Sequence, residues 1–571
     1  MSTHSCSQCQ SAFEVTASDR AFLDKMSPTF AGKKFTIPDP TLCPTCRQQR
    51  RAVQSNEINL YKRTCDLTGK PILSDIHPSM PYKVYDQEVW YSDKWDPMEY
   101  GRDFDFSRPF FEQYHELCKA VPHMNLFTGY QYDENCDYTN YSGKNKNCYL
   151  IFDSDENRDC YYSYSLNGCK DCVDCFRVRL SELCYQCVDC YKCYGSSYLQ
   201  DSVNCIDSMF LKNCTSCRNC LMCSNLTNKE YHVENKPVSK EVFAEYMAAL
   251  SSMSSLKSAH ARFNELKLQY PQKYMHGVQN ENVTGDYLTE CKNAEDCFDG
   301  IRLWDCKHVY RAFMPVKDSM DCEAVGDAEK LYECAVIGYS ANNLLFCANG
   351  LDQLSDYLYT TFSVHSSNLF GCNGLRHKKY CILNKQYTKE DYEVMVAKIL
   401  THMQKTPYQS SADNGTGQAV EWGEFFPVQL SPFAYNESAA FDYYPMTKEE
   451  VEARGWLWRD RDPKEYAPQS YAIPESISEV TDDVTKQTMA CTRCSKNFRV
   501  VLQELKFHQM RNLPLAHECF ECRHRERMAL RSPRKLHART CAKCSEPIST
   551  TYQPTRPEVV YCERCYTETV F

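Results

Sequence analysis

Small side chains recur at every third position through the middle of the chain. This spacing matches neither the 3.6-residue period of a helix nor the alternation of an ordinary strand. Residues 133–228 divide into eight consecutive blocks of 12 without an insertion. One column of the blocks consists of Cys136, Cys148, Cys160, Cys172, Cys184, Ser196, Ser208 and Cys220. All 15 cysteines from Cys136 to Cys223 share one phase of the three-residue grid, which chance produces about once in five million trials. The region is therefore an internal repeat.

A repeat of 12 residues is too short for a pair of helices and predicts a tight β-solenoid, whose stacked turns pair their backbones. Columns 1, 4, 7 and 10 of each block are expected to point inward, where a narrow turn admits only small side chains. At about 4.8 Å per turn, the eight turns extend about 38 Å. The pattern resembles the 12-residue turns of beetle antifreeze proteins. This chain lacks their regular Thr-x-Thr face, so ice binding is not expected.

A second copy of this arrangement is predicted further along the chain. The segment from Cys223 to Leu250 recurs from Cys372 onward at an offset of 149 residues. The matching residues of the second segment are Leu375, Lys378, Tyr380, Asn384, Lys385, Thr388, Lys389 and Glu390. A looser solenoid should precede it, with steps of 12 or 13 residues along Gly285, Cys297, Tyr310, Cys322, Cys334, Cys347, Tyr359 and Cys372. Each solenoid is expected to end in a helix, capped by Ser239 or Thr388.

The two ends of the chain are copies of one another. Residues 43–90 align on residues 519–566 without a gap, at a constant offset of 476, with 14 identities in 48 positions. The shared residues include Arg47 and Arg51, which match Arg523 and Arg527. Upstream, each copy begins at a CxxC pair, and the first copy has nine more residues between its two pairs. A duplicated module therefore brackets the repeats.

The CxxC pairs of these modules predict zinc sites. Two tight turns place four thiolates around one ion and leave no open coordination position, which makes such sites structural. The C-terminal sets are Cys491, Cys494, Cys519 and Cys522, and then Cys541, Cys544, Cys562 and Cys565. The N-terminal module keeps the first set as Cys6, Cys9, Cys43 and Cys46, but has Cys65, Thr68, Asp86 and Val89 at the second. Three Zn²⁺ ions are therefore expected rather than four.

The cysteines of the first solenoid leave another function open. The run Cys184, Cys187, Cys190 and Cys193 recurs as Cys214, Cys217, Cys220 and Cys223. Neither run has the longer last gap and the proline of a ferredoxin-type iron–sulfur motif, so stacked thiols in a packed core explain them better. A metal-storage or thiol-redox protein that uses the 24 cysteines from Cys118 to Cys381 is the alternative function.

The repeats and the modules predict the fold class. It is mainly β with some α: two tight cysteine-lined β-solenoid lobes (12-residue coils) flanked by N- and C-terminal zinc-ribbon modules. A helix is expected from Arg108 to Ala120, because Pro109 favours a helix start and Pro122 ends it. The expected domains are a zinc ribbon (1–62), a degenerate second ribbon (63–100), an aromatic helical connector (101–130), solenoid lobe A (131–236), a helix and linker (237–275), solenoid lobe B (276–386), a helix (387–406), a semi-ordered connector (407–488) and a basic double zinc-ribbon module (489–571).

Composition agrees with a large, reduced protein. The chain has 571 residues, 43% of them hydrophobic, which is enough for several packed cores. Its 37 cysteines are an odd number, and no charged start followed by an apolar stretch marks an export signal. No run of 18 apolar residues occurs, so a membrane span is not expected. We expect a cytoplasmic protein.

Charge is distributed unevenly and predicts a partner. Residues 489–571 carry a net charge of +7 and residues 1–70 a net charge of +4, although the whole chain is at −10. One dense basic stretch contains Arg523, Arg525, Arg527, Arg531, Arg534, Lys535 and Arg539. Basic zinc ribbons often bind phosphates, so nucleic acid or a ribonucleoprotein is the predicted partner of these residues. A solvated basic face, or a clasp onto the protein's own acidic solenoid, is the alternative.

No catalytic motif was found: GxSxG, HExxH, GxxxxGK[ST] and a GxGxxG in a suitable context are absent. The chain is therefore expected not to be an enzyme. With its double-ribbon ends, the basic stretch and the motifs Cys65-Asp-Leu-Thr-Gly-Lys70, Asp103-Phe-Asp-Phe-Ser-Arg-Pro109 and Trp422-Gly-Glu-Phe-Phe-Pro427, it resembles a family of uncharacterised cysteine-rich zinc-ribbon proteins predicted from candidate-phyla bacterial genomes. That resemblance implies no activity. The expected function is a zinc-stabilised scaffold or binding protein.

Overall fold

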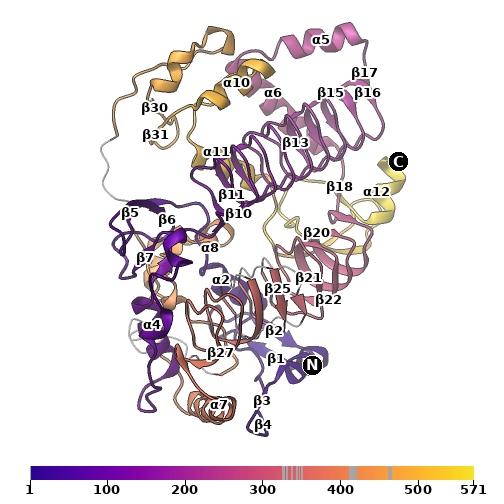
Figure 1. Cartoon of the computed structure of the whole chain (residues 1–571). Helices are drawn as coiled ribbons and strands as arrows, with labels where there is room; N and C mark the ends of the chain where they lie inside the picture. The colour runs from indigo at the N-terminus through magenta and orange to yellow at the C-terminus, as the bar shows by residue number, and fades with distance from the viewer. Residues whose placement is uncertain are drawn as a thin grey trace. The chain divides into compact units, whose positions relative to one another are not determined.

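A computed structural model describes residues 2–323, 328–329, 332–335, 339–342, 345, 347–348, 352–409, 420, 422–460 and 466–570. These residues form a mixed α/β structure with more strands than helices. The chain divides into two compact units, each assembled from segments far apart in the sequence (Figure 1). Unit 1 contains residues 1–126, 275–460 and 534–536, and unit 2 contains residues 127–274, 461–533 and 537–571.

The 12-residue region of unit 2, residues 131–236, is called repeat A here. Its strands pair in parallel with partners 12 residues further along, as in Ser197↔Met209 and Met209↔Leu221. Isolated bridges such as Val173↔Tyr185 continue the same offset where no strand is assigned. The ribbon accordingly forms a row of stacked turns in Figure 1. The strands are β9 (Thr128–Gly129), β10 (Asn140–Gly143), β11 (Tyr149–Asp155), β12 (Tyr161–Tyr164), β13 (Ser197–Gln200), β14 (Met209–Lys212), β15 (Arg218–Ser224), β16 (Glu230–Val233) and the antiparallel β17 (Lys236–Pro237).

Each turn of repeat A bends at every third residue, where the backbone is left-handed. Consecutive examples are Asp171, Asp174, Arg177 and Leu180, with φ between 49° and 56°. Asn and Asp tolerate this conformation better than other non-glycine residues, and they occupy many of these positions. Two of every three backbone N–H groups then donate to neighbouring turns. The N–H of the third residue, which carries the cysteine or serine, points into the interior.

The interior side chains satisfy these inward N–H groups. Ser163 Oγ accepts the N–H of Cys175, one turn later, at 2.9 Å, and Cys175 Sγ donates to the carbonyl of Val173 at 3.5 Å. Cys291 in unit 1 plays both roles, since its Sγ accepts the N–H of Leu303 at 3.4 Å and contacts the carbonyl of Thr289 at 3.3 Å. An alanine offers no such acceptor or donor. Cysteine and serine therefore recur because the core needs small side chains that form hydrogen bonds.

Residues 276–386 of unit 1 are called repeat B here. Their described strands form one 11-stranded sheet that follows chain order, parallel except for the antiparallel pair of its last two strands. Pairing shifts by one residue between Val283 and Gly285, and Leu303 pairs with Val316 at an offset of 13. The strands are β19 (Gly277–Val278), β20 (Glu281–Thr289), β21 (Lys292–Ile301), β22 (Leu303–Lys307), β23 (Val316–Lys317), β24 (Ala328–Glu329), β25 (Tyr339–Asn342), β26 (Asp352–Leu358), β27 (Ser366–Phe370), β28 (Lys379–Ile382) and β29 (Lys385–Gln386). Buried cysteines also fill this core.

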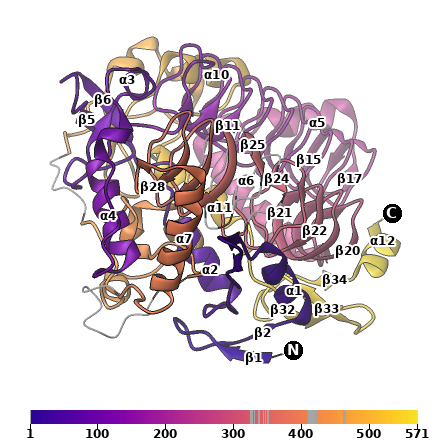
Figure 2. The ribbon, with the colours of Figure 1, turned by 60° about the horizontal axis from the view of Figure 1, so that its bottom comes forward.

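Helices cover the repeats within each unit. In unit 1, α4 (Phe110–Ala120) and α7 (Lys389–Met403) lie next to one another beside repeat B (Figure 2), and His402 of α7 contacts the carbonyl of Arg108 at 2.9 Å. Phe110 packs on Tyr359 of the repeat, with ring centroids 5.3 Å apart. In unit 2, α5 (Lys240–Ala248) and α6 (Met253–Leu266) follow repeat A. Ser239 and Thr388 cap α5 and α7, as the sequence predicts.

The connector predicted at 407–488 is divided between the units, and its residues 410–419, 421 and 461–465 lie outside the described residues. In unit 1 it contains the short helices α8 (Ala439–Tyr443) and α9 (Lys448–Glu452). Trp422 is buried and donates from Nε1 to the carbonyl of Thr36 at 3.2 Å. In the part of the chain that the structure describes, no helix combines the length and the hydropathy needed to cross a bilayer.

Candidate metal centres and the clamps beside them

Three groups of four cysteines could each hold a metal ion, and in each the sulfur atoms lie within 4.8 Å of one another. Around a tetrahedral Zn²⁺ with Zn–S bonds of about 2.3 Å, neighbouring sulfurs are separated by about 3.8 Å. One sulfur pair in each group lies 3.7 Å apart, so the thiols are spaced for such an ion. The groups are Cys6, Cys9, Cys43 and Cys46; Cys491, Cys494, Cys519 and Cys522; and Cys541, Cys544, Cys562 and Cys565. These are the predicted sets, and zinc itself stays a prediction.

Each group is built from a hairpin and a helix start. In the first ribbon, the turn between β1 (Ser2–Ser5) and β2 (Ala12–Val15) closes with the Cys6 N–H on the carbonyl of Ser11 at 2.9 Å, with Gln10 left-handed. Cys43 precedes α2 (Pro44–Ala52), and Cys46 lies in its first turn. The second ribbon repeats this with β30 (Met489–Ala490), β31 (Asn497–Phe498) and α11 (Phe520–Ala529), and the third with β32 (His537–Thr540), β33 (Pro547–Thr550) and α12 (Glu563–Val570).

In each group the surroundings lower the pKa of one thiol and so favour its thiolate, the form that binds metal. Burial raises the pKa of Cys491, but backbone N–H groups, first that of Cys519, outweigh it and lower the pKa to about 7. At Cys541 the same balance, with the N–H of Cys562 as the main donor, lowers the pKa to about 6. The hydrogen bond from Cys46 lowers the pKa of Cys43 to about 5. Other thiols of the groups shift the opposite way: the hydrogen bond with Cys43 raises the pKa of Cys46, and burial raises the pKa of Cys519 to about 11 and that of Cys565 to about 12. Each group therefore has one thiol favoured as a thiolate.

The degenerate ribbon keeps the hairpin without the ligands. The turn between β5 (Tyr61–Thr64) and β6 (Pro71–Ser74) closes with the Cys65 N–H on the carbonyl of Lys70 at 2.8 Å. The Asp86 carboxylate caps α3 (Gln87–Trp90) by accepting the N–H of Glu88 at 3.1 Å. No group of three or more ligands forms here among the described residues. The expectation of three zinc ions rather than four stays a prediction.

The degenerate ribbon has aromatic packing in place of the zinc expected in the corresponding C-terminal ribbon. Trp90 occupies the position of Tyr566, whose hydroxyl donates to Asn225 of repeat A at 2.9 Å in unit 2. The equivalent of Asn225, 149 residues on, is Gly374 of repeat B, where an added Cβ would lie 3.7 Å from the Trp90 ring and 3.1 Å from Val121. The larger indole thus lies over a glycine. The second ribbon of each module therefore docks at the same place on its repeat.

Buried arginines of α2 bind carboxylates of repeat B. Arg47 Nε lies 2.8 Å from Asp321, and Arg51 Nη1 lies 3.5 Å from the same carboxylate. Arg50, on the same helix, pairs with Glu333 at 2.8 Å. Burial raises the pKa of Asp321, but Arg47 and Arg51 outweigh it and hold the pKa below its usual range. We call this arrangement clamp 1.

The same contact recurs in unit 2. Arg527 Nη1 of α11 lies 2.9 Å from Asp174 of repeat A, and Arg523 pairs with the other oxygen of that carboxylate. The exposed fractions of these three side chains are 1%, 0% and 3%, respectively. Asp174 precedes Cys175 as Asp321 precedes Cys322, four turns before the matched cysteines at 223 and 372. This arrangement, clamp 2, is therefore the counterpart of clamp 1 in sequence and in contacts.

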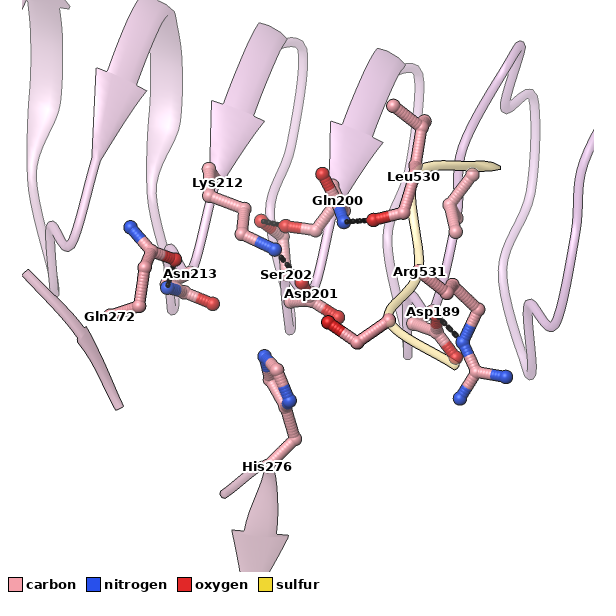
Figure 3. Close-up of polar contacts among 12 residues, drawn as sticks. Asp189, Gln200, Asp201, Ser202, Lys212, Asn213, Gln272, His276, Leu530 and Arg531 are labelled. Carbon is pink, nitrogen blue, oxygen red and sulfur yellow. Dashed lines mark hydrogen bonds and ion pairs between the residues drawn. The ribbon is translucent and has the colours of Figure 1, made fainter. Parts of the chain in front are cut away.

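Positions 189, 201 and 213 form one column of repeat A, and the residues that follow α11 meet its first turn. Arg531 Nε lies 2.8 Å from Asp189, and Gln200 Nε2 donates to the carbonyl of Leu530 at 2.9 Å (Figure 3). On the next turns, Lys212 pairs with Asp201, and Asn213 donates to Gln272 at 3.1 Å. The acidic column is thus occupied by groups of the same unit.

This arrangement gives the predicted nucleic-acid residues another role. Arg523, Arg527 and Arg531 pair with Asp174 and Asp189, and Arg534 pairs with Asp299 of unit 1 at 2.7 Å. Arg539 donates to the carbonyls of Gln553 and Glu558, as Arg63 does to those of His77 and Tyr82 in the first module. Only Arg525 and Lys535 of the seven have no partner among the described residues, and both are exposed. The clasp onto the protein's own acidic solenoid, held open as an alternative, accounts for four of the seven, and Arg539 stabilises its own ribbon.

The thiols of the repeats form no comparable site. All 37 cysteines are free, and those of repeat A from Cys148 to Cys223 are buried. The groups that could hold metal, within the residues described, include none of them. Many donate instead to two carbonyls, as Cys172 does to Lys170 at 3.4 Å and Ser181 at 3.5 Å.

The clamp carboxylates were not identified from the sequence. Asp174 lies 349 residues from Arg523 along the chain, and nothing local marks it among the many acidic residues of the repeat. One signal was available: the arginine pair survives in both copies of the ribbon, and an aspartate precedes the matched cysteine in both repeats.

Comparisons with known proteins add little. No protein-family model matches the chain, and no curated protein matches it. Among solved structures, a putative acetyltransferase from Desulfovibrio desulfuricans G20 matches 46% of this chain and 70% of its own, with 9% identity and a TM-score of 0.10. That score carries no argument about fold or activity.

Proposed function

We propose that the chain is a non-enzymatic, zinc-stabilised cytoplasmic scaffold in which zinc ribbons clamp two β-solenoids, repeats A and B. The observation that supports it most directly is the duplicated contact of an arginine pair with one buried aspartate. Each arginine pair lies on the helix that begins at a CxxC set, directly after the last cysteine of the set. A metal that fixes the helix start thereby fixes the arginines.

Zinc suits the sites because four cysteines close a tetrahedron and leave no reactive position. A tetrahedral set of four thiolates also accepts iron, so the metal is decided by its measured identity. The test is elemental analysis of the full chain purified without oxygen. Three zinc ions per chain and no iron are expected. Replacing Cys544, which contacts Cys562 at 3.7 Å, with Ser should remove one zinc, and the same change at Cys118, outside the three groups, should remove none.

Metal storage by the repeat thiols is the competing function, and the same experiment decides it. More than about three metals per chain, with a matching loss of titratable thiol, would favour storage over the scaffold. Burial and hydrogen bonding of the thiols support the scaffold.

Nucleic-acid docking by the C-terminal ribbons is a second candidate function, now limited to two of the seven predicted basic residues. Its support is that Arg525 and Lys535 are exposed and have no carboxylate partner among the described residues. Replacing both with Ala should weaken binding of an oligonucleotide if this surface docks it, whereas Arg523 and Arg527 should act only through folding. Binding that does not weaken with salt would contradict this candidate.

A further inference from the structure

The outer face of repeat A changes character over two of its turns. Its columns of bridged residues are charged at the start, where Lys146 pairs with Glu134 at 2.7 Å across turns. Further on, the same columns carry Tyr191, Val203, Tyr194 and Ile206. Three apolar side chains of these and the preceding turn have large exposed fractions: 50% for Leu180, 44% for Tyr194 and 36% for Val203. We call Leu180, Tyr191, Tyr194, Val203 and Ile206 the tyrosine stripe.

Unpaired cations border the tyrosine stripe. The guanidinium of Arg179 lies 5.6 Å from the centre of the Tyr191 ring, and Lys192 Nζ lies 5.1 Å from it. Arg218 follows Ile206 in its column. None of these three cations has a carboxylate partner among the described residues. Of the nearby acids, Glu182 pairs with Lys170 at 2.7 Å, and Asp207, directly after Ile206, is exposed, so the three cations outnumber the remaining acid. The stripe is therefore a cationic aromatic patch on an acidic protein.

We propose that the tyrosine stripe binds single-stranded nucleic acid. Sequence-tolerant binders of single strands combine aromatic rings, on which bases stack, with cations that follow the phosphates. Tyr191 and Tyr194 supply two rings on adjacent columns, and Arg179, Lys192 and Arg218 supply the cations. A duplex hides its bases from such rings, so it should bind less well. The proposal rests on the scaffold function, since the stacked turns set the spacing of these side chains.

The test measures fluorescence anisotropy of labelled 20-mers of U and of dT, and of a 20-bp duplex, with the full chain. Both single strands should bind more tightly than the duplex. Three neutralised phosphates on a single strand give a slope of about −2 in log affinity against log salt, so binding should weaken about 20-fold from 50 to 200 mM NaCl. Preference between U and dT tells whether RNA or DNA fits better, and either supports the proposal.

Tyr191→Ala with Tyr194→Ala should weaken binding at least about tenfold. Lys192→Gln with Arg218→Gln should reduce the salt slope and leave the rings in place. The matched controls are Tyr132→Ala, an exposed tyrosine (69%) at the start of the repeat, and Lys146→Ala, an exposed lysine of an earlier turn; neither should change the affinity. Zinc content and thermal melting of every variant separate loss of binding from loss of the scaffold.

Four results would overturn the proposal. They are no binding of the single strands at 50 mM salt, equal binding of the duplex, an unchanged affinity in the double tyrosine variant, and loss of binding in Arg525→Ala with Lys535→Ala instead. Binding of a labelled polyglutamate peptide, without binding of either oligonucleotide, would assign the stripe to an acidic protein.

Discussion

Replacing Asp174 with Asn tests whether clamp 2 holds the ribbon on repeat A. The change keeps the shape of the side chain but removes the carboxylate that Arg523 and Arg527 share. Arg523 retains Glu504 at 3.6 Å, so the charge left without a carboxylate is that of Arg527. Removing one partner of a buried ion pair costs about 3–5 kcal/mol, because the remaining charge is uncompensated. If α11 then opens locally, its opening equilibrium rises by about two to four powers of ten. The effect should be confined to unit 2.

Hydrogen exchange followed by mass spectrometry measures this opening. Peptides covering residues 520–529 should exchange faster in Asp174→Asn, while those covering residues 44–52 should not change. Asp321→Asn should give the reverse result, because it breaks clamp 1. The matched control is Asp171→Asn, one bend earlier in the same turn, where the side chain is 33% exposed and pairs with Lys170 at 3.5 Å. An exposed pair of this kind contributes under about 1 kcal/mol.

A further variant tests whether the faster exchange comes from leaving a buried charge unpaired or from changing the side chain at position 174. Buried ion pairs replaced by apolar residues of similar volume often lose no stability. Asp174→Leu combined with Arg527→Met, which leaves Arg523 paired with Glu504, should therefore exchange much more slowly than Asp174→Asn alone. The reasoning is wrong if Asp174→Asn accelerates exchange in α11 no more than Asp171→Asn does. It is also wrong if the two clamps respond equally to either substitution.

Two other predictions concern the core and the pH. Cys291→Ala should destabilise unit 1 by about 1–3 kcal/mol, since the Leu303 N–H loses its acceptor, whereas Cys291→Ser should cost less; equal urea midpoints for the two variants would contradict this. Burial lowers the pKa of His508 to about 4, so from pH 6.5 to 4 the unfolded chain binds a proton that the folded chain does not. His508 alone should lower stability by about 3 kcal/mol across that range, and Glu504, whose pKa burial raises to about 7, offsets part of it. Since His508 Nδ1 contacts the carbonyl of Leu513 at 3.2 Å, His508→Asn keeps a donor there and should reduce the fall; an unchanged pH dependence would exclude His508 as its source.

The features predicted from the sequence are those set by short-range spacing. A CxxC turn fixes two thiols within four residues, so the three cysteine groups follow from the sequence alone. The 12-residue phase likewise predicts which residues pair across turns, such as Val173 and Tyr185. The solenoid architecture, zinc and the partner stay predictions. The left-handed bends were missed, although Asn and Asp at every third position gave a signal for them.

The features missed depend on contacts between distant parts of the chain. A run of arginines has the same composition whether it faces phosphates or its own carboxylates. Only the fold tells that Arg531 meets Asp189 while Arg525 is exposed. The net negative charge of the rest of the chain indicated an alternative partner, because carboxylates of the same chain can pair with the arginines as well as an external polyanion can. The net charge does not identify which carboxylates do so.

The crossed order of the chain gives the clamps their importance. The N-terminal ribbon belongs to the unit of repeat B, and the C-terminal ribbons to the unit of repeat A, although repeat A comes first in the sequence. In each unit, therefore, the ribbon docks on its repeat through residues far apart in the sequence. Such contacts cost loop-closure entropy, and no neighbouring residues in the chain direct them. Hydrophobic packing alone is weakly directional. An arginine pair that meets one buried aspartate instead penalises a wrong turn or a wrong repeat, because a mismatch leaves buried charges unpaired. The second ribbons lack this arginine pair. In unit 2, Tyr566 contacts Asn225, and in unit 1, Trp90 lies at the equivalent Gly374, so each aromatic side chain matches the residue of its own repeat. The clamps are thus best explained as devices that specify which ribbon docks on which turn, more than as a source of stability.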